Sequence, residues 1–200
     1  MEGGLTVPVW PVRQTVGVRF FVAVSLPPDA IELVGDLPRP DLASLRWTTE
    51  DQWHITLRFL GEVASPSAVA EALTKVPEAL REARVGEIEI VLGAATAWFR
   101  GRRILHVPVT GLDMLASVVA EVTASFGERS EEDPPFAGHL TLARVRRNAT
   151  GPANLAGTPV SAEWTVPEIV LMSSTLGPGG SRYGVVAKVP LGRTPNPDGA

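Results

Sequence analysis

A four-residue motif that occurs twice places the strongest constraint on how this chain can fold. His54-Ile55-Thr56-Leu57 returns 85 positions later as His139-Leu140-Thr141-Leu142, and the two copies contain two of the three histidines in 200 residues. Polar and apolar side chains alternate in both copies, and successive side chains of a β-strand point to opposite faces of its sheet. Each copy therefore predicts a half-buried strand that directs its His and Thr to one face and its aliphatic side chains to the core.

If the two predicted strands meet, their polar faces form a pocket suited to a phosphate. It would hold two imidazoles and two hydroxyls, with no carboxylate or thiol built into either motif. A neutral imidazole can take a proton from water while a protonated one gives a proton to a leaving oxygen, and threonine hydroxyls can donate to phosphoryl oxygens. We therefore predict acid–base catalysis by His54 and His139, with Thr56 and Thr141 holding the phosphoryl group.

Three further side chains are candidates for binding substrate. Strict alternation places Arg58 on the face of His54 and Thr56, where its charge could neutralise a phosphoryl group. Arg144 follows His139 by five residues, which puts it off the polar face, so it is a secondary candidate. Tyr183, beyond a glycine-rich turn, either stacks on a base or packs within a sheet.

No metal or cofactor is predicted. Zinc sites usually have three or four ligands from His, Cys, Asp and Glu at close spacing. The chain has no cysteine, no pair of histidines at helical spacing, and no acidic residue inside either motif. The third histidine, His106, lies in the apolar run 104–109 without an accompanying threonine, and we interpret it as structural.

Composition limits the class of protein and its partners. Two hundred residues with 44% hydrophobic content are enough for one compact domain or two closely packed halves. The net charge of −4 argues against a broad nucleic-acid surface, so any contact with RNA should be local. Without cysteine, an export signal or an 18-residue apolar segment, we expect a cytoplasmic protein that does not enter a membrane. Nothing in the sequence specifies a partner protein, and we expect a monomer.

The remaining pattern predicts an α+β fold of two similar lobes around a groove, each lobe with one motif strand, a helix and accessory strands. The predicted elements are a first strand at 18–27, a helix at 28–34, a helix from its N-cap Ser65 through Leu80 with a bend at Pro77, strands at 87–92 and 103–109, a helix at 112–126, and strands at 164–172 and 183–189. Residues 128–135 and 147–159 are predicted surface connections. Residues 1–17 and 193–200 are predicted flexible tails around a single domain at 18–192.

At its motifs the chain resembles the two-histidine (2H) phosphoesterases, and within them the RNA 2′,3′-cyclic phosphodiesterases also described as 2′-5′ RNA ligases. The resemblance covers residues 18–191. It includes the first strand with its Leu-Pro end, the segment from Trp53 to Val63, the residues on both sides of the second motif, and a closing hairpin at 173–183. It implies a bilobal fold with a pseudo-twofold axis, in which two antiparallel sheets with outer helices flank a central groove.

The resemblance also implies a reaction, in which a terminal RNA 2′,3′-cyclic phosphate is opened to a 2′-phosphomonoester without a metal. One departure from the family pattern is Gly138, because the family commonly has proline directly before its second histidine. A glycine loosens the approach to the strand and could change the orientation of His139. The similarity of the two motifs does not distinguish the base from the acid.

Three alternative functions remain open from the sequence. The same site run backwards would be a 2′-5′ RNA ligase. The substrate could instead be a small cyclic nucleotide. A module that binds RNA ends without catalysis is the third alternative, although intact His and Thr in both motifs argue against it.

Overall fold

The computed structural model describes residues 17–99, 101–127, 135–177 and 180–192. Apart from Gly17, the predicted tails lie outside these residues, as does most of the predicted connection at 128–135. The elements are β1 (Arg19–Val24), α1 (Pro28–Gly35), β2 (Leu45–Trp47), β3 (Ile55–Gly61), α2 (Pro66–Leu73), α3 (Val76–Glu82), β4 (Glu89–Ala95), β5 (Ala97–Phe99), β6 (Ile104–Thr110), α4 (Asp113–Val122), β7 (His139–Val145), β8 (Pro159–Thr165), β9 (Glu168–Gly177) and β10 (Gly180–Pro190). Two short 3-10 helices lie at Glu50–Gln52 and Ala153–Leu155.

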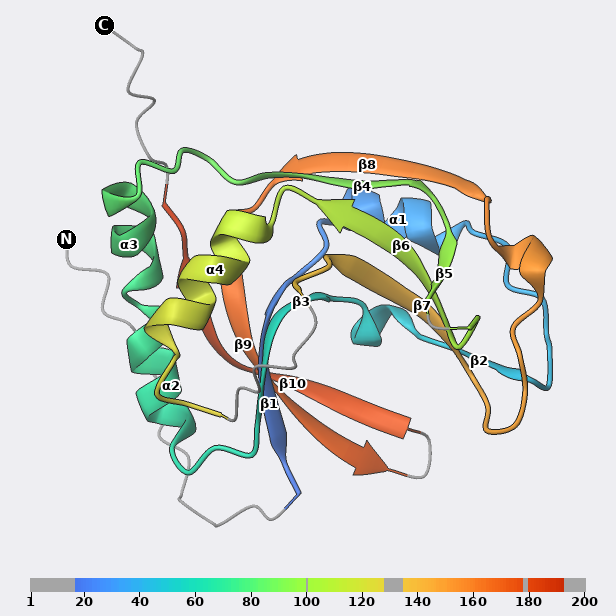
Figure 1. Ribbon diagram of the computed structural model, residues 1–200, viewed down its shortest axis with the longest axis horizontal. Helices are drawn as coiled ribbons and strands as arrows, with labels where there is room; N and C mark the ends of the chain where they lie inside the picture. Colours follow the sequence, from blue (N-terminus) through green and yellow to red (C-terminus); the bar gives the residue numbers. More distant parts are fainter. Residues whose placement is uncertain (1–16, 100, 128–134, 178–179, 193–200) are drawn as a thin grey trace, which may run out of the picture.

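The strands form a continuous antiparallel path that divides into two lobes (Figure 1). The strand order is β10-β9-β1-β3-β7-β6-β4-β8, with β2 beside β7 and β5 beside β6. One lobe is built on β10, β9, β1 and β3, and the other on β7, β6, β4 and β8. They join where β3 meets β7, at the residue pair Ile55 and Leu140, both of which are fully buried. The predicted α+β fold with two antiparallel sheets is confirmed.

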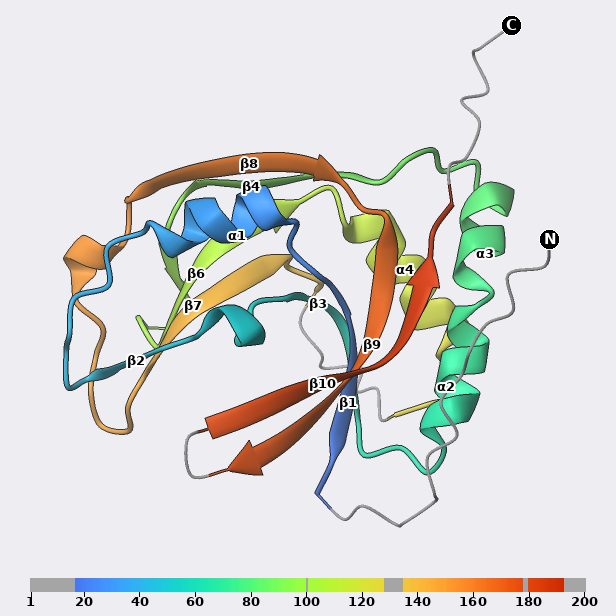
Figure 2. The same ribbon diagram turned by 180° about the vertical axis from the view of Figure 1, so that it is seen from behind.

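Each lobe is covered partly by a helix that follows a strand of the other lobe. Helix α1 follows β1 in the first lobe but packs against β8 of the second, whereas α4 follows β6 in the second lobe and packs against β3 of the first. Figure 2 shows α1 beneath β8 and β4, away from the group formed by α2, α3 and α4. This exchange ties the lobes together and keeps the helices outside the sheets.

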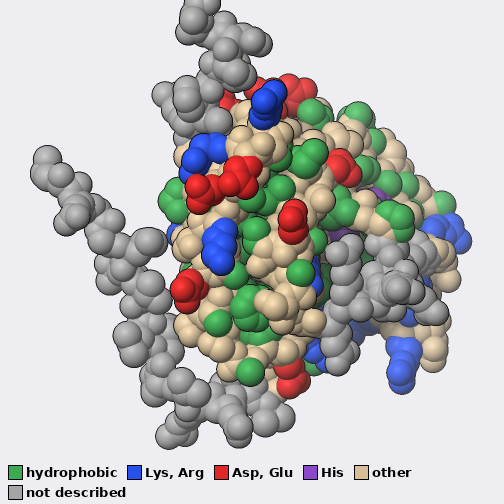
Figure 3. Space-filling view, turned by 60° about the vertical axis from the view of Figure 1, so that its left-hand side comes forward, with side chains coloured by type: hydrophobic (Ala, Val, Ile, Leu, Met, Phe, Trp, Pro, Cys, Tyr) green, Lys and Arg blue, Asp and Glu red, His purple; other side chains and the backbone are tan. Residues whose placement is uncertain are grey.

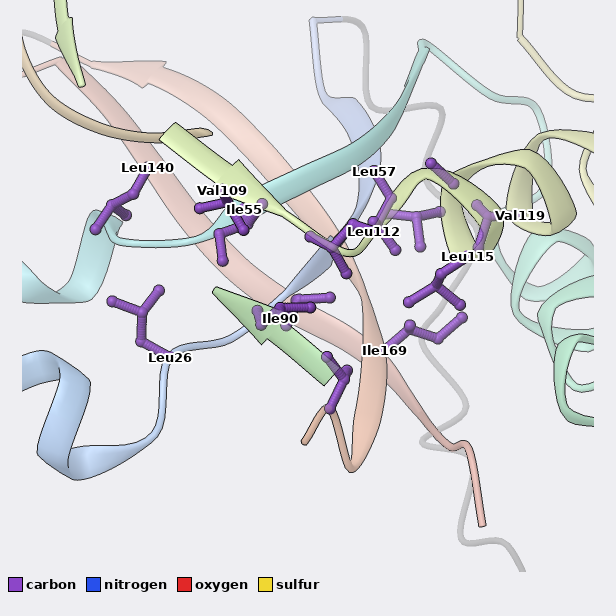
Figure 4. Packing of buried hydrophobic residues seen from close by; sticks show 14 of the residues in the cluster. Leu26, Ile55, Leu57, Ile90, Val109, Leu112, Leu115, Val119, Leu140 and Ile169 are labelled. Atoms are coloured by element: carbon purple, nitrogen blue, oxygen red, sulfur yellow. The ribbon is translucent and has the colours of Figure 1, made fainter. Parts of the chain in front are cut away.

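A single large core runs under both lobes and fixes the two motif strands from behind. The aliphatic side chains of the motifs, Ile55, Leu57, Leu140 and Leu142, are all buried in it. Figure 4 shows Ile55, Leu57 and Leu140 in one cluster with residues of α4, among them Leu112 and Leu115. Complete burial of such a side chain contributes roughly 1.5–3 kcal/mol, so a one-residue slip of a motif strand would be costly.

Several predicted boundaries differ from the structure. The predicted helix at 66–80 is two helices, α2 and α3, because Pro77 has no N–H for a continuous helix and instead lies in the first turn of α3. Its predicted N-cap is confirmed, since Ser65 Oγ accepts from the backbone N–H of Ala68. Strands β2 and β5 were not predicted, and β8 begins inside the predicted connection at 147–159.

Candidate active site

The two motif histidines are held by the same backbone hydrogen bond. His54 Nδ1 lies 2.8 Å from the carbonyl oxygen of Gln52, and His139 Nδ1 lies 2.8 Å from that of Ala137. A carbonyl oxygen only accepts, so in each ring Nδ1 carries the proton and donates it. Nε2 of each ring is therefore the nitrogen that can take up or release a proton.

The junction of β3 and β7 brings the two motifs together. Ile55 pairs with Leu140 in antiparallel orientation, and this register continued by one residue in each direction would place His54 beside Thr141 and Thr56 beside His139. The two histidines are then diagonal neighbours on one face, which corresponds to about 7 Å in a regular sheet. Each half of the site thus combines the imidazole of one motif with the hydroxyl of the other.

A bulge in β3 moves Arg58 away from this face. Ala23 of β1 pairs with Thr56 and Val22 pairs with Arg58, so Leu57 has no partner in β1 and the alternation changes phase there. The Arg58 guanidinium lies at the C-terminal end of α4, where it donates to the carbonyls of Ala120 and Phe126 and to Thr123 Oγ1. The prediction that Arg58 shares the face of His54 is wrong, because it assumed an unbroken alternation.

An equivalent bulge in β7 has the opposite effect on Arg144. His106 of β6 pairs with Thr141 and Leu105 pairs with Ala143, which leaves Leu142 without a partner in β6. Leu142 and Ala143 are both buried, and the exposed Arg144 returns to the face of His139. Arg144 borders a small pocket with Tyr183, and its charge acts on His54. The arginine placed off the site by strict alternation is the one that lies beside it.

Thr48 stabilises the bulge in β7, and the sequence analysis did not identify it. Its backbone N–H donates to the carbonyl of Leu142, and its hydroxyl lies 2.9 Å from the carbonyl oxygens of both Thr141 and Leu142. The indole N–H of Trp53 in turn donates to the Thr48 hydroxyl. The segment before the first motif therefore supports the backbone of the second.

Aromatic rings surround His54. The ring of Phe21 lies 4.7 Å from the imidazole and that of Tyr183 lies 4.9 Å from it, with centroids as the reference points. Burial is the main cause that lowers the pKa of His54 from 6.5 to about 4; the hydrogen bond to Gln52 acts in the opposite direction, and the nearby Arg144 and His139 contribute smaller lowering effects. His54 is therefore uncharged at neutral pH.

His139 is packed against Phe99 and His106. The rings of Phe99 and His106 are stacked with their centroids 3.7 Å apart, and both stand nearly perpendicular to the His139 ring, at 4.9 and 5.8 Å. His106 is only 4% exposed, and its burial, followed by the charge of His139, lowers its pKa to about 4. The third histidine is thus buried and also forms a wall of the site, a contact that its apolar sequence context did not predict.

Gly138 allows the second motif to approach β6 closely. A Cβ atom at this position would lie 2.5 Å from the carbonyl oxygen of Val109, whose N–H donates to the carbonyl of Gly138. The hydrogen bond from His139 to the carbonyl two residues earlier has the same length as the one made by His54. With Gly138 in this position, His139 keeps the same support as His54.

Histidine side chains reach the molecular surface. Figure 3 shows small purple areas of histidine on the right-hand half of the view, with Lys and Arg side chains both there and among the acidic side chains on the left. Across the described residues, no group of three or more His, Cys, Asp and Glu side chains is arranged to hold a metal ion. No helix within the described ranges is long and apolar enough to cross a membrane.

Comparison with known proteins gives consistent matches. The family model of LigT like phosphoesterases matches residues 22–102. An RNA 2′,3′-cyclic phosphodiesterase of Geobacillus stearothermophilus is 31% identical over 189 residues, which cover 86% of this chain. The chain spans 57% of the length of that relative. An RNA 2′,3′-cyclic phosphodiesterase of Escherichia coli K12 is 27% identical over 177 residues, which cover 82% of this chain and 92% of the relative.

The fold also matches a solved structure. A crystal structure of a Thermus thermophilus protein superposes with a TM-score of 0.65 at 28% identity. The superposition covers 86% of this chain and 97% of that one. The described architecture therefore has a counterpart of almost the same extent.

Proposed function

The chain belongs to the two-histidine (2H) phosphoesterases with LigT-like proteins, and from this membership we propose that it hydrolyses RNA 2′,3′-cyclic phosphate ends. Two relatives named as RNA 2′,3′-cyclic phosphodiesterases support this substrate. A cyclic phosphodiester is also compatible with a site that has two imidazoles, two hydroxyls and an arginine but no carboxylate within its motifs. The proposed product is a 2′-phosphomonoester with a free 3′-hydroxyl.

The matched support of the two histidines is the observation that carries this proposal. Both Nδ1 atoms donate to a carbonyl two residues earlier, at 2.8 Å, so both Nε2 atoms are available for proton transfer. In-line displacement at phosphorus needs one group to take a proton on the attacking side and one to give a proton on the leaving side. Two imidazoles on one face, diagonal to each other, meet this requirement.

We assign the base to His54 and the acid to His139. With its pKa lowered to about 4, His54 is neutral near pH 7 and can accept a proton. The same reaction needs a proton donor for the leaving oxygen, and we give this role to His139, the imidazole of the second motif. The near-symmetrical motifs thus have different roles because their surroundings differ.

The proposed step balances without a cofactor. His54 Nε2 takes a proton from water as the water oxygen forms a bond to phosphorus. The bond from phosphorus to O3′ breaks, and O3′ takes a proton from His139 Nε2. Thr56 and Thr141 donate to the non-bridging oxygens, and the charge of Arg144 opposes the negative charge that develops on them. A proton returned from His54 to His139 through solvent restores the starting state.

The test is hydrolysis of a 2′,3′-cyclic-phosphate-ended oligoribonucleotide in EDTA by the wild type, His54→Asn and His139→Asn. We expect turnover to a 2′-phosphate by the wild type and a loss of about a hundredfold or more in each variant, as general acid–base roles imply. Thermal unfolding of all three proteins separates loss of chemistry from loss of fold. Retained RNA binding without turnover by the wild type would overturn the proposal in favour of a binding module. Turnover only of a small cyclic nucleotide would overturn the RNA substrate.

A further inference from the structure

A small pocket with two arginines in its lining borders the proposed catalytic face. Its lining includes Arg46, Arg144, Gln52, Ser181 and Tyr183, which we call the arginine pocket. Tyr183 also contacts the His54 ring, so one side chain separates this pocket from the first histidine. The arginine pocket and the proposed catalytic face are therefore close enough for one extended molecule to contact both.

Two arginines stand side by side in this pocket. Arg46 of β2 faces Arg144 of β7 directly across the strand pair, and both side chains are exposed. Among the described residues, Lys188 and Glu168 form an ion pair. Neither Arg46 nor Arg144 forms an ion pair or donates a side-chain hydrogen bond within the described part of the chain. Like charges directly opposite each other are unfavourable in a sheet, and an anion bound between them would remove the repulsion.

The backbone around the pocket is shaped to admit Arg46. Gly180 has a positive φ of 107°, and a Cβ atom there would overlap the Arg46 guanidinium. A residue with a side chain would therefore displace Arg46, whereas glycine both adopts this conformation and leaves space. The guanidinium is held over the start of β10, close to Ser181 and Tyr183.

Gln52 couples the pocket to His54. Its side-chain N–H donates to the carbonyl of Ser181 at 2.7 Å, while its side-chain oxygen accepts from the N–H of Thr49. The backbone carbonyl of the same residue accepts the hydrogen bond from His54 Nδ1. Gln52 therefore both lines the arginine pocket and supports His54, which fixes the position of the pocket relative to the proposed base.

From this juxtaposition we infer that the arginine pocket binds a second phosphate group of the substrate, the phosphodiester next to the terminal cyclic phosphate. This inference rests on the proposed function and narrows its substrate class to RNA ends with at least two nucleotides. Arginine binds phosphate oxygens through paired N–H groups, so the fork of Arg46 can bind the singly charged diester while Arg144 beside it faces the cyclic phosphate. A cyclic mononucleotide has no group for this pocket.

The experiment compares kcat/KM for two substrates. One is adenosine 2′,3′-cyclic monophosphate, and the other is a dinucleotide of two adenosines that ends in the same 2′,3′-cyclic phosphate. Arg46→Met removes the charge but keeps an unbranched apolar side chain, and Arg81→Met on α3 is the matched control on a distant helix. We expect the wild type to have a higher kcat/KM for the dinucleotide than for the mononucleotide. In Arg46→Met the ratio of these two values should fall about tenfold, as the loss of a charge-assisted contact implies. Arg81→Met should keep it.

A dinucleotide with a neutral methylphosphonate between its nucleosides isolates the contact. If Arg46 binds the internal phosphate, the losses in kcat/KM caused by the neutral linkage and by Arg46→Met should not add. On the methylphosphonate substrate, Arg46→Met should then be as active as the wild type. Hydrolysis of both natural substrates with no change in preference in Arg46→Met would overturn the inference and leave the proposed function intact. Hydrolysis of neither substrate by the wild type would overturn both.

Discussion

Phe59 and Arg144 occupy equivalent positions in the two halves of the site, each five residues after a motif histidine and just beyond a bulge. Phe59 is 64% exposed and lies with its ring 5.6 Å from that of Phe21, which contacts His54. Arg144 is exposed on the other strand and borders the arginine pocket. The repeat therefore supplies an aromatic surface on one side and a positive charge on the other.

Replacement of Arg144 by glutamine should change the pH dependence of catalysis. Arg144 lowers the pKa of His54, so removing its charge raises that pKa toward the ordinary value, although burial still holds it down. Activity that depends on neutral His54 rises with pH through this pKa. We therefore expect the rising limb of the kcat/KM profile to move to higher pH, together with a loss of about tenfold or more at the plateau.

Arg144→Lys is the control for that experiment, because it retains the positive charge. Its rising limb should stay near that of the wild type even if its plateau is low, since lysine lacks the planar fork. A limb that stays in place in Arg144→Gln would show that the charge does not act on His54.

Arg58→Met should destabilise the protein and spare its chemistry. The Arg58 guanidinium donates to Ala120, Thr123 and Phe126 at the C-terminal end of α4, where a positive charge also stabilises the negative end of the helix dipole. We expect the free energy of unfolding to fall by about 2–4 kcal/mol in a denaturant titration. In conditions where the variant is folded, kcat/KM should remain within about twofold of the wild type. A large loss of activity at unchanged stability would instead place Arg58 on the substrate.

His106→Phe should weaken the acid sensitivity of the fold. The pKa of His106 is about 4 in the folded protein against an ordinary 6.5, so the unfolded chain binds more protons between these values. Stability is then fully present above pH 6.5 and is lost as the pH falls toward 4, by on the order of 3 kcal/mol for this one group. Denaturant titrations from pH 7.5 to 4 should give a shallower decline in the variant.

The decline should not vanish in His106→Phe, because His54 has a lowered pKa in the same range. The comparison is therefore between slopes and not between absolute stabilities, which the substitution itself can change. Equal slopes in the variant and the wild type would mean that His106 is protonated with little cost in the folded protein.

Gly138→Ala should disturb the second motif. The added Cβ would lie 2.5 Å from the Val109 carbonyl oxygen, so β6 and β7 must separate at the point where His139 begins its strand. We expect a loss of about 1–3 kcal/mol in stability and a fall in kcat. Gly86→Ala is the matched control, since a Cβ there has no neighbour within 4 Å. Equal behaviour of the two variants would contradict a steric role for Gly138.

The sequence was sufficient to predict the parts of the site that depend on local alternation. From each histidine to the leucine three residues later, polar and buried side chains alternate as a regular strand requires. The α+β class and the N-cap at Ser65 also follow from local patterns and were predicted correctly, whereas the antiparallel sheets were implied by the family resemblance. The local features need no knowledge of the partner strand.

Features decided by a neighbouring strand could not be predicted in the same way. The bulges at Leu57 and Leu142 arise from the register with β1 and β6, and they exchanged the expected positions of Arg58 and Arg144. The proximity of His106 to His139 likewise depends on the pairing of β6 with β7. Two consecutive apolar residues after the second threonine, Leu142 and Ala143, were the one local signal of a change in phase.

The pairing of Ile55 with Leu140 has a mechanical consequence. The two imidazoles belong to different lobes, and this apolar pair lies at the junction between them. A rotation of one lobe about the junction would alter the gap between base and acid without changing either half-site internally. In the proposed mechanism the distance between the two imidazoles therefore depends on how this buried pair packs, and we expect that trimming Ile55 or Leu140 would slow a reaction that neither side chain touches.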